Sequence, residues 1–185
     1  MENKRWLLGI TGASGAIYAA RFLHHMHALG CPVDVMISDC GREVLAFEEQ
    51  LASLELASRI FVNTDMFAAP ASGSARYVGM AVLPCSMGTL GRMAAGISDS
   101  LLTRAADVCL KERRPLVLCP REMPLSQIHL ENLLRLQKAG AIIIPASPSF
   151  YRHPKNIEEL VDSVVVKVLD HLQVDHQVAK AWGSP

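Results

Sequence analysis

Short apolar runs alternate along the chain with longer amphipathic segments. The runs are four to six residues long and mostly apolar, which is typical of strands buried on both faces of a parallel sheet. Hydroxyl, glycine or charged residues follow the runs and mark their ends. The predicted strands are Arg5–Ile10, Val33–Ile37, Val78–Leu83, Leu116–Cys119 and Ala141–Ile144.

The amphipathic segments between these runs predict helices. In the last of them, apolar residues recur every three or four positions from Ile157 to Val168, which is the spacing of one helix face. The pattern allows a break in the middle of the second helix and another at Gly96–Asp99 in the third. The predicted helices are Ser14–Leu29, which Gly30 closes, Gly41–Ser58, Thr89–Arg114, Leu125–Ala139 and Asn156–Leu172.

Strands that alternate with helices predict βαβ units, a parallel sheet and right-handed crossovers, so the expected class is α/β. The 185 residues show no repeat or linker, and we expect one domain over residues 1–185. The small residues of Pro70–Arg76 indicate either a mobile loop, which is slightly favoured, or a ligand surface. Trp182 is unusual for a free tail, so the tail from about residue 174 is expected to pack on a neighbouring subunit.

The composition favours a globular chain and excludes several classes of partner. Half of the residues are hydrophobic and 19% are charged, which argues against disorder. Lys and Arg together number 18, as do Asp and Glu, so nothing indicates binding to nucleic acid or to an anionic membrane surface. No apolar run is long enough for a membrane span, and the first residues lack the pattern of a signal peptide.

The spacing of the cysteines and histidines does not favour a metal site, and the histidines are better explained by surface or oligomer contacts. The five cysteines include no CxxC pair, so we expect free thiols and a cytoplasmic protein without a disulfide framework. Three histidines, His24, His25 and His27, crowd one predicted helix, but no carboxylate or thiol completes a ligand set. We therefore expect no metal.

The stretch from Arg104 to Asn132 gives the first indication of a ligand site. A wholly apolar strand, Leu116–Cys119, runs directly into Pro120, Arg121 and Glu122, which place two adjacent charges where a buried strand surfaces. In an open α/β sheet, ligands bind at the carboxyl ends of the strands. Arg121 and Glu122 are therefore candidate site residues.

The loop after the first strand has the pattern GxxGxxG, from Gly9 to Gly15. Glycines allow a close approach to a ligand and the following helix offers free N–H groups, so the loop suits a phosphate. The spacing is not GxGxxG and the second strand ends in Ser38 rather than an acid, so a generic NAD site is poorly supported. No GxxxxGK[ST] motif is present, which excludes a P-loop. The alternative is a tight turn with no ligand.

Other strand ends carry similar chemistry. Ser86 and Thr89 follow the third strand, although an ordinary helix cap explains them equally well in isolation. Tyr151 follows the fifth strand and can donate a hydrogen bond. Arg104 and Lys111 share one helix face, either as a solvated surface or as a cationic wall for an anionic substrate. The coincidence of such residues along one sheet edge is the main indication of a site.

Six longer motifs cover these strand ends and the helices beside them. They are Gly12–Gly15, Pro84–Met87, Leu102–Val108, Leu110–Arg113, Arg121–Leu125 and Ile128–Asn132. Together they closely resemble the UbiX/Pad1 family of flavin prenyltransferases, and the resemblance extends from Gly9 to Trp182.

The resemblance implies a flavodoxin-like or Rossmann-like three-layer fold with a central parallel sheet, assembled as a homododecamer with sites at subunit contacts. It implies that dimethylallyl monophosphate prenylates reduced FMN at N5 and C6 of the isoalloxazine, without a metal. The product, prenyl-FMN, would serve a UbiD-type decarboxylase. The residues that the resemblance places on FMN are Gly12, Ala13, Ser14, Ser38, Ser86, Met87, Gly88, Thr89 and Arg121.

The resemblance also implies a site for the prenyl donor. Clustered cations would neutralise the leaving phosphate in place of a metal, and Glu122 would assist proton transfer as phosphate leaves. The family usually has Arg at position 167, and Lys167 keeps the charge but loses the bidentate fork. The implied residues are Lys111, Arg104, Tyr151 and Lys167 for the phosphate, Glu48 and Trp182 as lining, and Glu122, Lys111 and Ser14 as catalytic groups.

Two alternatives are less well supported. Flavin-dependent cysteine decarboxylases share the fold, but they carry a different loop after the third strand and a PxMN-type signature, neither of which is found here. A non-catalytic flavin carrier, acting as an accessory subunit of an aromatic acid decarboxylase, would need the glycine and serine loops but not the charged cluster. The presence of Arg104, Lys111, Arg121, Glu122 and Tyr151 argues against the carrier.

Overall fold

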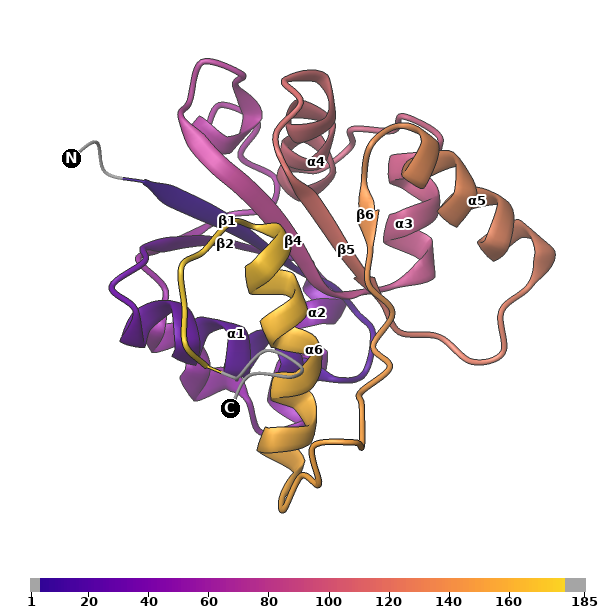
Figure 1. Ribbon diagram of the computed structural model, residues 1–185. Coiled ribbons are helices and arrows are strands. Elements are labelled where there is room, and N and C mark those ends of the chain that lie inside the picture. The colour runs from indigo at the N-terminus through magenta and orange to yellow at the C-terminus, as the bar shows by residue number, and fades with distance from the viewer. Residues whose placement is uncertain (1–3, 179–185) are drawn as a thin grey trace.

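A twisted sheet of six parallel strands forms the centre of the molecule (Figure 1). The computed structural model describes residues 4–178 of the chain. The strands lie in the order β3-β2-β1-β4-β5-β6, which is the order of the Rossmann fold. They are β1 (Arg5–Ile10), β2 (Val33–Ile37), β3 (Arg59–Phe61), β4 (Tyr77–Cys85), β5 (Leu116–Pro120) and β6 (Ile142–Ile143).

Helices cover both faces of the sheet and complete the predicted three layers (Figure 1). One face carries α1 (Ala16–Ala28), α6 (Ile157–His171) and Leu45 of α2 (Asp39–Phe47). The opposite face carries α3 (Met87–Ala94), α4 (Leu101–Lys111) and α5 (Gln127–Lys138). Two short 3-10 helices are η1 (Leu51–Leu56) and η2 (Ala69–Ala71).

The alternation of side chains along each strand explains the two hydrophobic layers. On β1, Trp6, Leu8 and Ile10 pack toward α1 and α6, whereas Leu7 packs toward α4. All residues of β2 and β5 are buried, because both faces of the sheet are covered.

Strand β3 was missing from the prediction. Its three residues, Arg59–Phe61, are mostly exposed and pair only with β2 at the edge of the sheet. The helix predicted over Gly41–Ser58 is α2 followed by η1, and Glu49, with a φ of 57°, lies at the break between them. The helix predicted over Thr89–Arg114 is likewise two helices, α3 and α4, separated at Gly96–Asp99.

The segment Pro70–Arg76 is held in place rather than free, contrary to the slightly favoured prediction. Arg104 Nε donates a hydrogen bond to the carbonyl oxygen of Ala71 at 3.1 Å. Arg114 donates two, to the carbonyl oxygens of Gly73 and Ala75, each at 2.6 Å. Arg104 of α4 and Arg114, three residues after its end, therefore hold this loop beside the helix by hydrogen bonds.

Val174, at the start of the tail, is buried against its own chain. The remainder of the tail from residue 179, including Trp182, lies outside the described residues. Over residues 4–178, no helix combines the length and apolar character that crossing a bilayer requires.

Candidate active site

The order of the strands reverses between β1 and β4, and this is the position where ligands bind in open α/β sheets. Thr11, fully buried just after β1, joins the two strand ends. Its hydroxyl donates to the carbonyl oxygen of Pro84 at 2.8 Å and accepts from the backbone N–H of Ser86 at 2.7 Å. The loops after β1 and β4 are therefore fixed relative to each other without a ligand.

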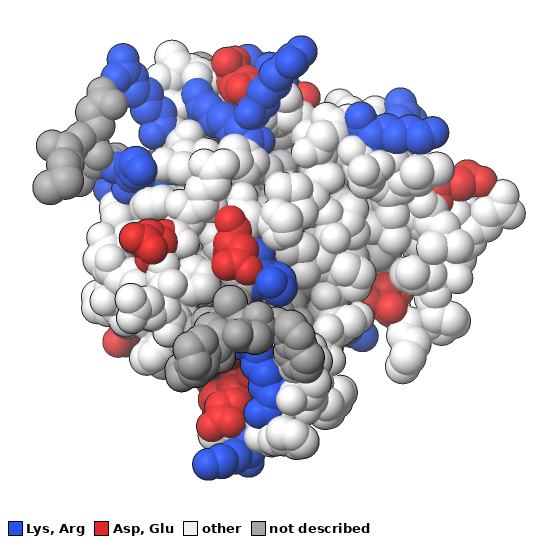
Figure 2. Space-filling model, in the orientation of Figure 1, with Lys and Arg blue, Asp and Glu red and all other residues white. Residues whose placement is uncertain are grey.

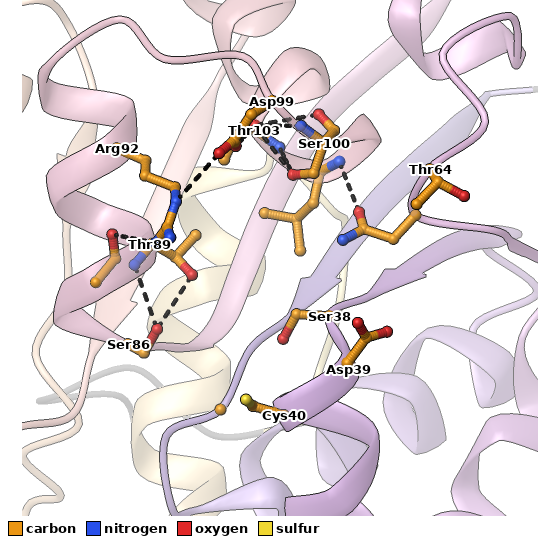
Figure 3. Close-up of a pocket in the computed structure, with 14 residues that line it drawn as sticks. Ser38, Asp39, Cys40, Thr64, Ser86, Thr89, Arg92, Asp99, Ser100 and Thr103 are labelled. Atoms are coloured by element: carbon orange, nitrogen blue, oxygen red, sulfur yellow. Dashed lines mark hydrogen bonds and ion pairs between the residues drawn. The ribbon is translucent and has the colours of Figure 1, made fainter.

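A pocket of about 470 Å³ opens at this edge (Figure 3). Five of the residues predicted to hold FMN line it, namely Gly12, Ser38, Ser86, Gly88 and Thr89. The prediction did not include the other nine, which are Asp39, Cys40, Asn63, Thr64, Arg92, Asp99, Ser100, Leu102 and Thr103. Asn63 and Thr64 follow the missed strand β3, so detecting that strand would have indicated them.

Two helix starts face the pocket. The hydroxyl of Ser38 accepts a hydrogen bond from Gly41 N at 3.0 Å and so caps the start of α2. The hydroxyl of Ser86 accepts from Thr89 N at 3.4 Å and donates to the Thr89 hydroxyl at 3.1 Å, and so begins α3. A Cβ added at Gly88 would meet only the guanidinium of Arg92 within 4 Å, so the first turn of α3 is open toward the pocket. Hydroxyls beside an open helix start are a suitable environment for a phosphate.

The third helix start at this pocket, that of α4, is already saturated. Asn63 accepts from Leu101 N through its carbonyl oxygen at 2.7 Å and from Leu102 N through its side chain at 3.0 Å. Ser100 and Thr103 form a reciprocal capping box. This helix start therefore forms a wall of the pocket and offers no open N–H groups there.

The start of α1 is also occupied, and the occupant is a carboxylate of the chain itself. Glu48 Oε2 accepts from Ala16 N at 2.7 Å and from Gly15 N at 3.0 Å. Instead of being free, as the sequence had indicated, the N–H groups of Gly15 and Ala16 are therefore hydrogen-bonded to Glu48. An anion is present there, as the chemistry of a helix start favours, but it is Glu48.

Glu48 belongs to a charged group beside the pocket. Burial raises the pKa of Glu48, but hydrogen bonds from Ser14, Gly15 and Ala16, together with the charge of Arg121, outweigh it and hold that pKa below the ordinary glutamate value. Arg121 Nε donates to the carbonyl oxygen of Ser14 at 3.0 Å. The structure thus brings together three predicted residues from distant parts of the chain.

Three further predicted residues follow the same strand ends: Glu122 as a catalytic group, and Ala13 and Met87 as flavin contacts. Glu122, next to Arg121, is exposed and accepts from the N–H of Met123 at 3.1 Å. Ala13 is buried, and so is the side chain of Met87, which packs in the core. These two residues can therefore contact a flavin mainly through their backbone.

The four residues predicted for the prenyl phosphate are not brought together within one chain. Lys111 ends α4, about 15 Å from the start of that helix at the pocket, and it pairs with Glu112. Arg104 pairs with Asp107 at 2.6 Å. Lys167 pairs with Asp170 near the end of α6. Figure 2 shows Lys and Arg side chains gathered along the upper edge of the molecule, over the amino ends of the strands.

Tyr151 lies elsewhere, in the loop after β6, where it is half-exposed and Arg152 stacks on its ring. Trp182 lies outside the described residues. Within residues 4–178, no cluster of three or more His, Cys, Asp or Glu side chains is arranged to hold a metal ion.

Comparison with known proteins identifies the family. The flavoprotein family model matches residues 1–169. The flavin prenyltransferase UbiX of Methanothermobacter thermautotrophicus is 44% identical over 97% of this chain and 95% of its own length. The UbiX of Pseudomonas aeruginosa is 42% identical over 98% of this chain and 95% of its own.

Solved structures agree with this assignment. AnUbiX, crystallised with FMN and dimethylallyl pyrophosphate, superposes with a TM-score of 0.94 at 37% identity and covers 99% of both chains. A dodecameric FMN-dependent UbiX-like decarboxylase from Escherichia coli gives a TM-score of 0.92 at 39% identity over 97% of this chain and 100% of that one. The cysteine decarboxylase TvaF shares the fold alone, with a TM-score of 0.66 and 16% identity. The chain therefore belongs to the flavoprotein family and, within it, to the UbiX flavin prenyltransferases.

Proposed function

We propose that this protein is a flavin prenyltransferase, which joins a dimethylallyl group from dimethylallyl monophosphate to N5 and C6 of reduced FMN. One observation carries the proposal. Gly12 lines the pocket, and Ser14, two residues further on, meets Glu48 and Arg121. The first loop therefore connects a phosphate-suited pocket to a charged group, as a reaction between a flavin and an allylic phosphate requires.

The pocket residues would bind and orient the flavin. Ser38, Ser86 and Thr89 offer hydroxyls, and Gly12 and Gly88 allow a close approach of the backbone. Bound reduced FMN would supply the nucleophilic N5 and C6. Since Glu48 already occupies the start of α1, we place the flavin phosphate at the start of α3 instead.

The charged residues would act on the prenyl donor. The carbon–oxygen bond to phosphate breaks as carbon bonds to the flavin, so negative charge accumulates on the leaving phosphate. Arg104, Lys111, Tyr151 and Lys167 would bind that phosphate. Glu122 is exposed at a strand end beside Arg121, where it can exchange a proton with the departing group.

A complete donor site then needs more than one copy of the chain. The ends of α4 and α6 place Lys111 and Lys167 away from the carboxyl edge of their own sheet. A dodecameric relative supports the same assembly here. We place Lys111, Tyr151 and Lys167 at the pocket of neighbouring subunits in a homododecamer.

The product would be prenyl-FMN, for use by a UbiD-type decarboxylase. Its release to another protein suits a cytoplasmic enzyme, and the five cysteines are all unpaired thiols, which agrees with a reducing compartment. The single-domain organisation of residues 1–185 is part of the same proposal.

The test is an anaerobic assay with reduced FMN and two donors, dimethylallyl monophosphate and dimethylallyl diphosphate. We expect the mass of a prenylated flavin with the monophosphate. A Glu122→Gln variant should retain FMN but form product more slowly. If the wild-type protein binds FMN and yields no mass gain with either donor, the flavin-carrier alternative is correct.

A further inference from the structure

Arg92 is a pocket residue with no role in the function proposed so far. It lies four residues after Gly88 on α3, and its side chain lines the pocket (Figure 3). Its Nη1 donates to the carbonyl oxygen of Gly88 at 3.3 Å, and its Nε donates to Oδ2 of Asp99 at 3.3 Å. Long side chains on a helix lean toward its amino end, so the guanidinium is carried back over the first turn of α3.

The charges around the pocket make this position important. Among the fourteen lining residues, all of them described, Arg92 is the only Lys or Arg, whereas Asp39 and Asp99 are both acidic. A phosphate monoester carries roughly two negative charges at neutral pH. Two carboxylates in the same pocket repel it, and neutral hydroxyls give hydrogen bonds only about half as strong as those from a cation.

The other arginines near the site are engaged elsewhere. Arg121 donates to the carbonyl oxygen of Ser14, in the charged group beside Glu48. Arg104 is held by Asp107 and by the carbonyl oxygen of Ala71. Neither lines the pocket, whereas Arg92 does, and the guanidinium of Arg92 contacts Gly88 in the first turn of α3.

We propose that Arg92 binds the phosphate of FMN and that Asp99 is its counter-ion while the pocket is empty. This inference rests on the proposed function only in that the pocket takes a flavin. Contact of Nε with Asp99 leaves the Nη edge directed over the turn that holds the hydroxyls of Ser86 and Thr89. A phosphate there would meet a charged fork and two hydroxyls.

The pair can exchange partners readily. The side chains of Arg92 and Asp99 are both 53% exposed, and exposed ion pairs contribute little stability. Replacing the Asp99 carboxylate by a phosphate dianion therefore costs little. The consequence is selectivity, because FMN carries the phosphate that Arg92 would bind and riboflavin does not.

The experiment measures dissociation constants for FMN and riboflavin in wild type and in R92A, R92K, D99N and R42A. Arg42 is a matched control, because it is an exposed arginine on α2 that does not line the pocket. We expect R92A to bind FMN about tenfold more weakly and riboflavin unchanged. R92K should recover part of the loss, since it keeps the charge without the fork. R42A should match wild type.

Asp99 has a separate expected result. D99N removes a negative charge that competes with the phosphate, so it should bind FMN more tightly and riboflavin unchanged. Weaker binding of FMN by D99N would overturn the counter-ion role.

Two outcomes would overturn the role of Arg92. One is an unchanged preference for FMN over riboflavin in R92A. The other is an equal loss for both flavins, which would show that Arg92 only supports the fold of the pocket. A wild-type protein that binds neither flavin would instead overturn the proposed function, and this inference with it.

Discussion

The contact between Gly12 and Cys40 gives the sharpest structural prediction. A Cβ added at Gly12 would lie 2.6 Å from the Cβ of Cys40, far inside van der Waals contact. The next nearest atoms are the backbone C and Cα of Cys40, at 3.5 and 3.6 Å, which are ordinary contacts. A Gly12→Ala substitution should therefore destabilise the fold, and a single atom, the Cβ of Cys40, should be the cause.

Overpacking of this kind typically costs about 1–3 kcal/mol. For a chain of this size, that cost corresponds to a fall in Tm of about 2–12 °C. Since Gly12 and Cys40 both line the pocket, relief of the clash by movement of α2 should also weaken FMN binding. Thermal unfolding and flavin fluorescence titration measure the two effects.

A second substitution isolates the cause. Cys40→Gly removes the clashing Cβ and should restore most of the Tm and FMN affinity to the Gly12→Ala protein. Cys40→Gly alone should cost only a few tenths of a kcal/mol at the start of a helix. The reasoning is refuted if Gly12→Ala behaves as wild type, or if the double variant is as impaired as the single one.

Two further predictions concern pH and stability. Glu48→Gln should lower stability by about 0.5–1 kcal/mol at neutral pH, because a partly exposed carboxylate that caps a helix loses its charge. The pKa of Glu48 is depressed in the folded state, so this stability is present above the ordinary glutamate pKa and is lost in acid, where unfolding curves of variant and wild type should converge. Burial raises the pKa of Asp162, but hydrogen bonds from His25 and Arg21 lower it more, to about 2. As the pH falls from about 5 to 2, the free energy of unfolding of wild type should decrease by about 1–2 kcal/mol more than that of Asp162→Asn. Denaturant unfolding at several pH values measures this difference, and parallel pH profiles of the two proteins would contradict it.

The buried strands were predictable because burial on both faces leaves a continuous apolar run. The observed bounds of β1 and β2 are those predicted, Arg5–Ile10 and Val33–Ile37. Strand β3 was not predictable on this basis, since an edge strand of three mostly exposed residues has neither an apolar run nor a clear alternation. Because the strand was not predicted, Asn63 and Thr64, the pocket residues that follow its carboxyl end, were not predicted either.

The residues of the candidate site were predictable only where a polar or charged side chain directly follows a predicted strand. Ser38, Ser86 and Arg121 each follow a recognised strand. Arg92 and Asp99 reach the pocket through the length of α3 and the turn after it, and such a meeting depends on tertiary geometry. Glu48 also lies far from Gly15 in sequence, so its occupation of the α1 start follows from the packing of α2 and not from a local motif.

The carboxylate of Glu48 at the start of α1 also bears on turnover. A helix that already holds its own anion attracts a second one weakly, so part of the attraction that a nucleotide-binding fold usually offers is neutralised before any flavin arrives. In the proposed prenyltransferase reaction, tight retention of the flavin would limit each catalytic cycle to the rate of product release. The carboxylate of Glu48 thus ties the first loop to the end of α2 and leaves less of the positive potential of this helix start for a flavin anion.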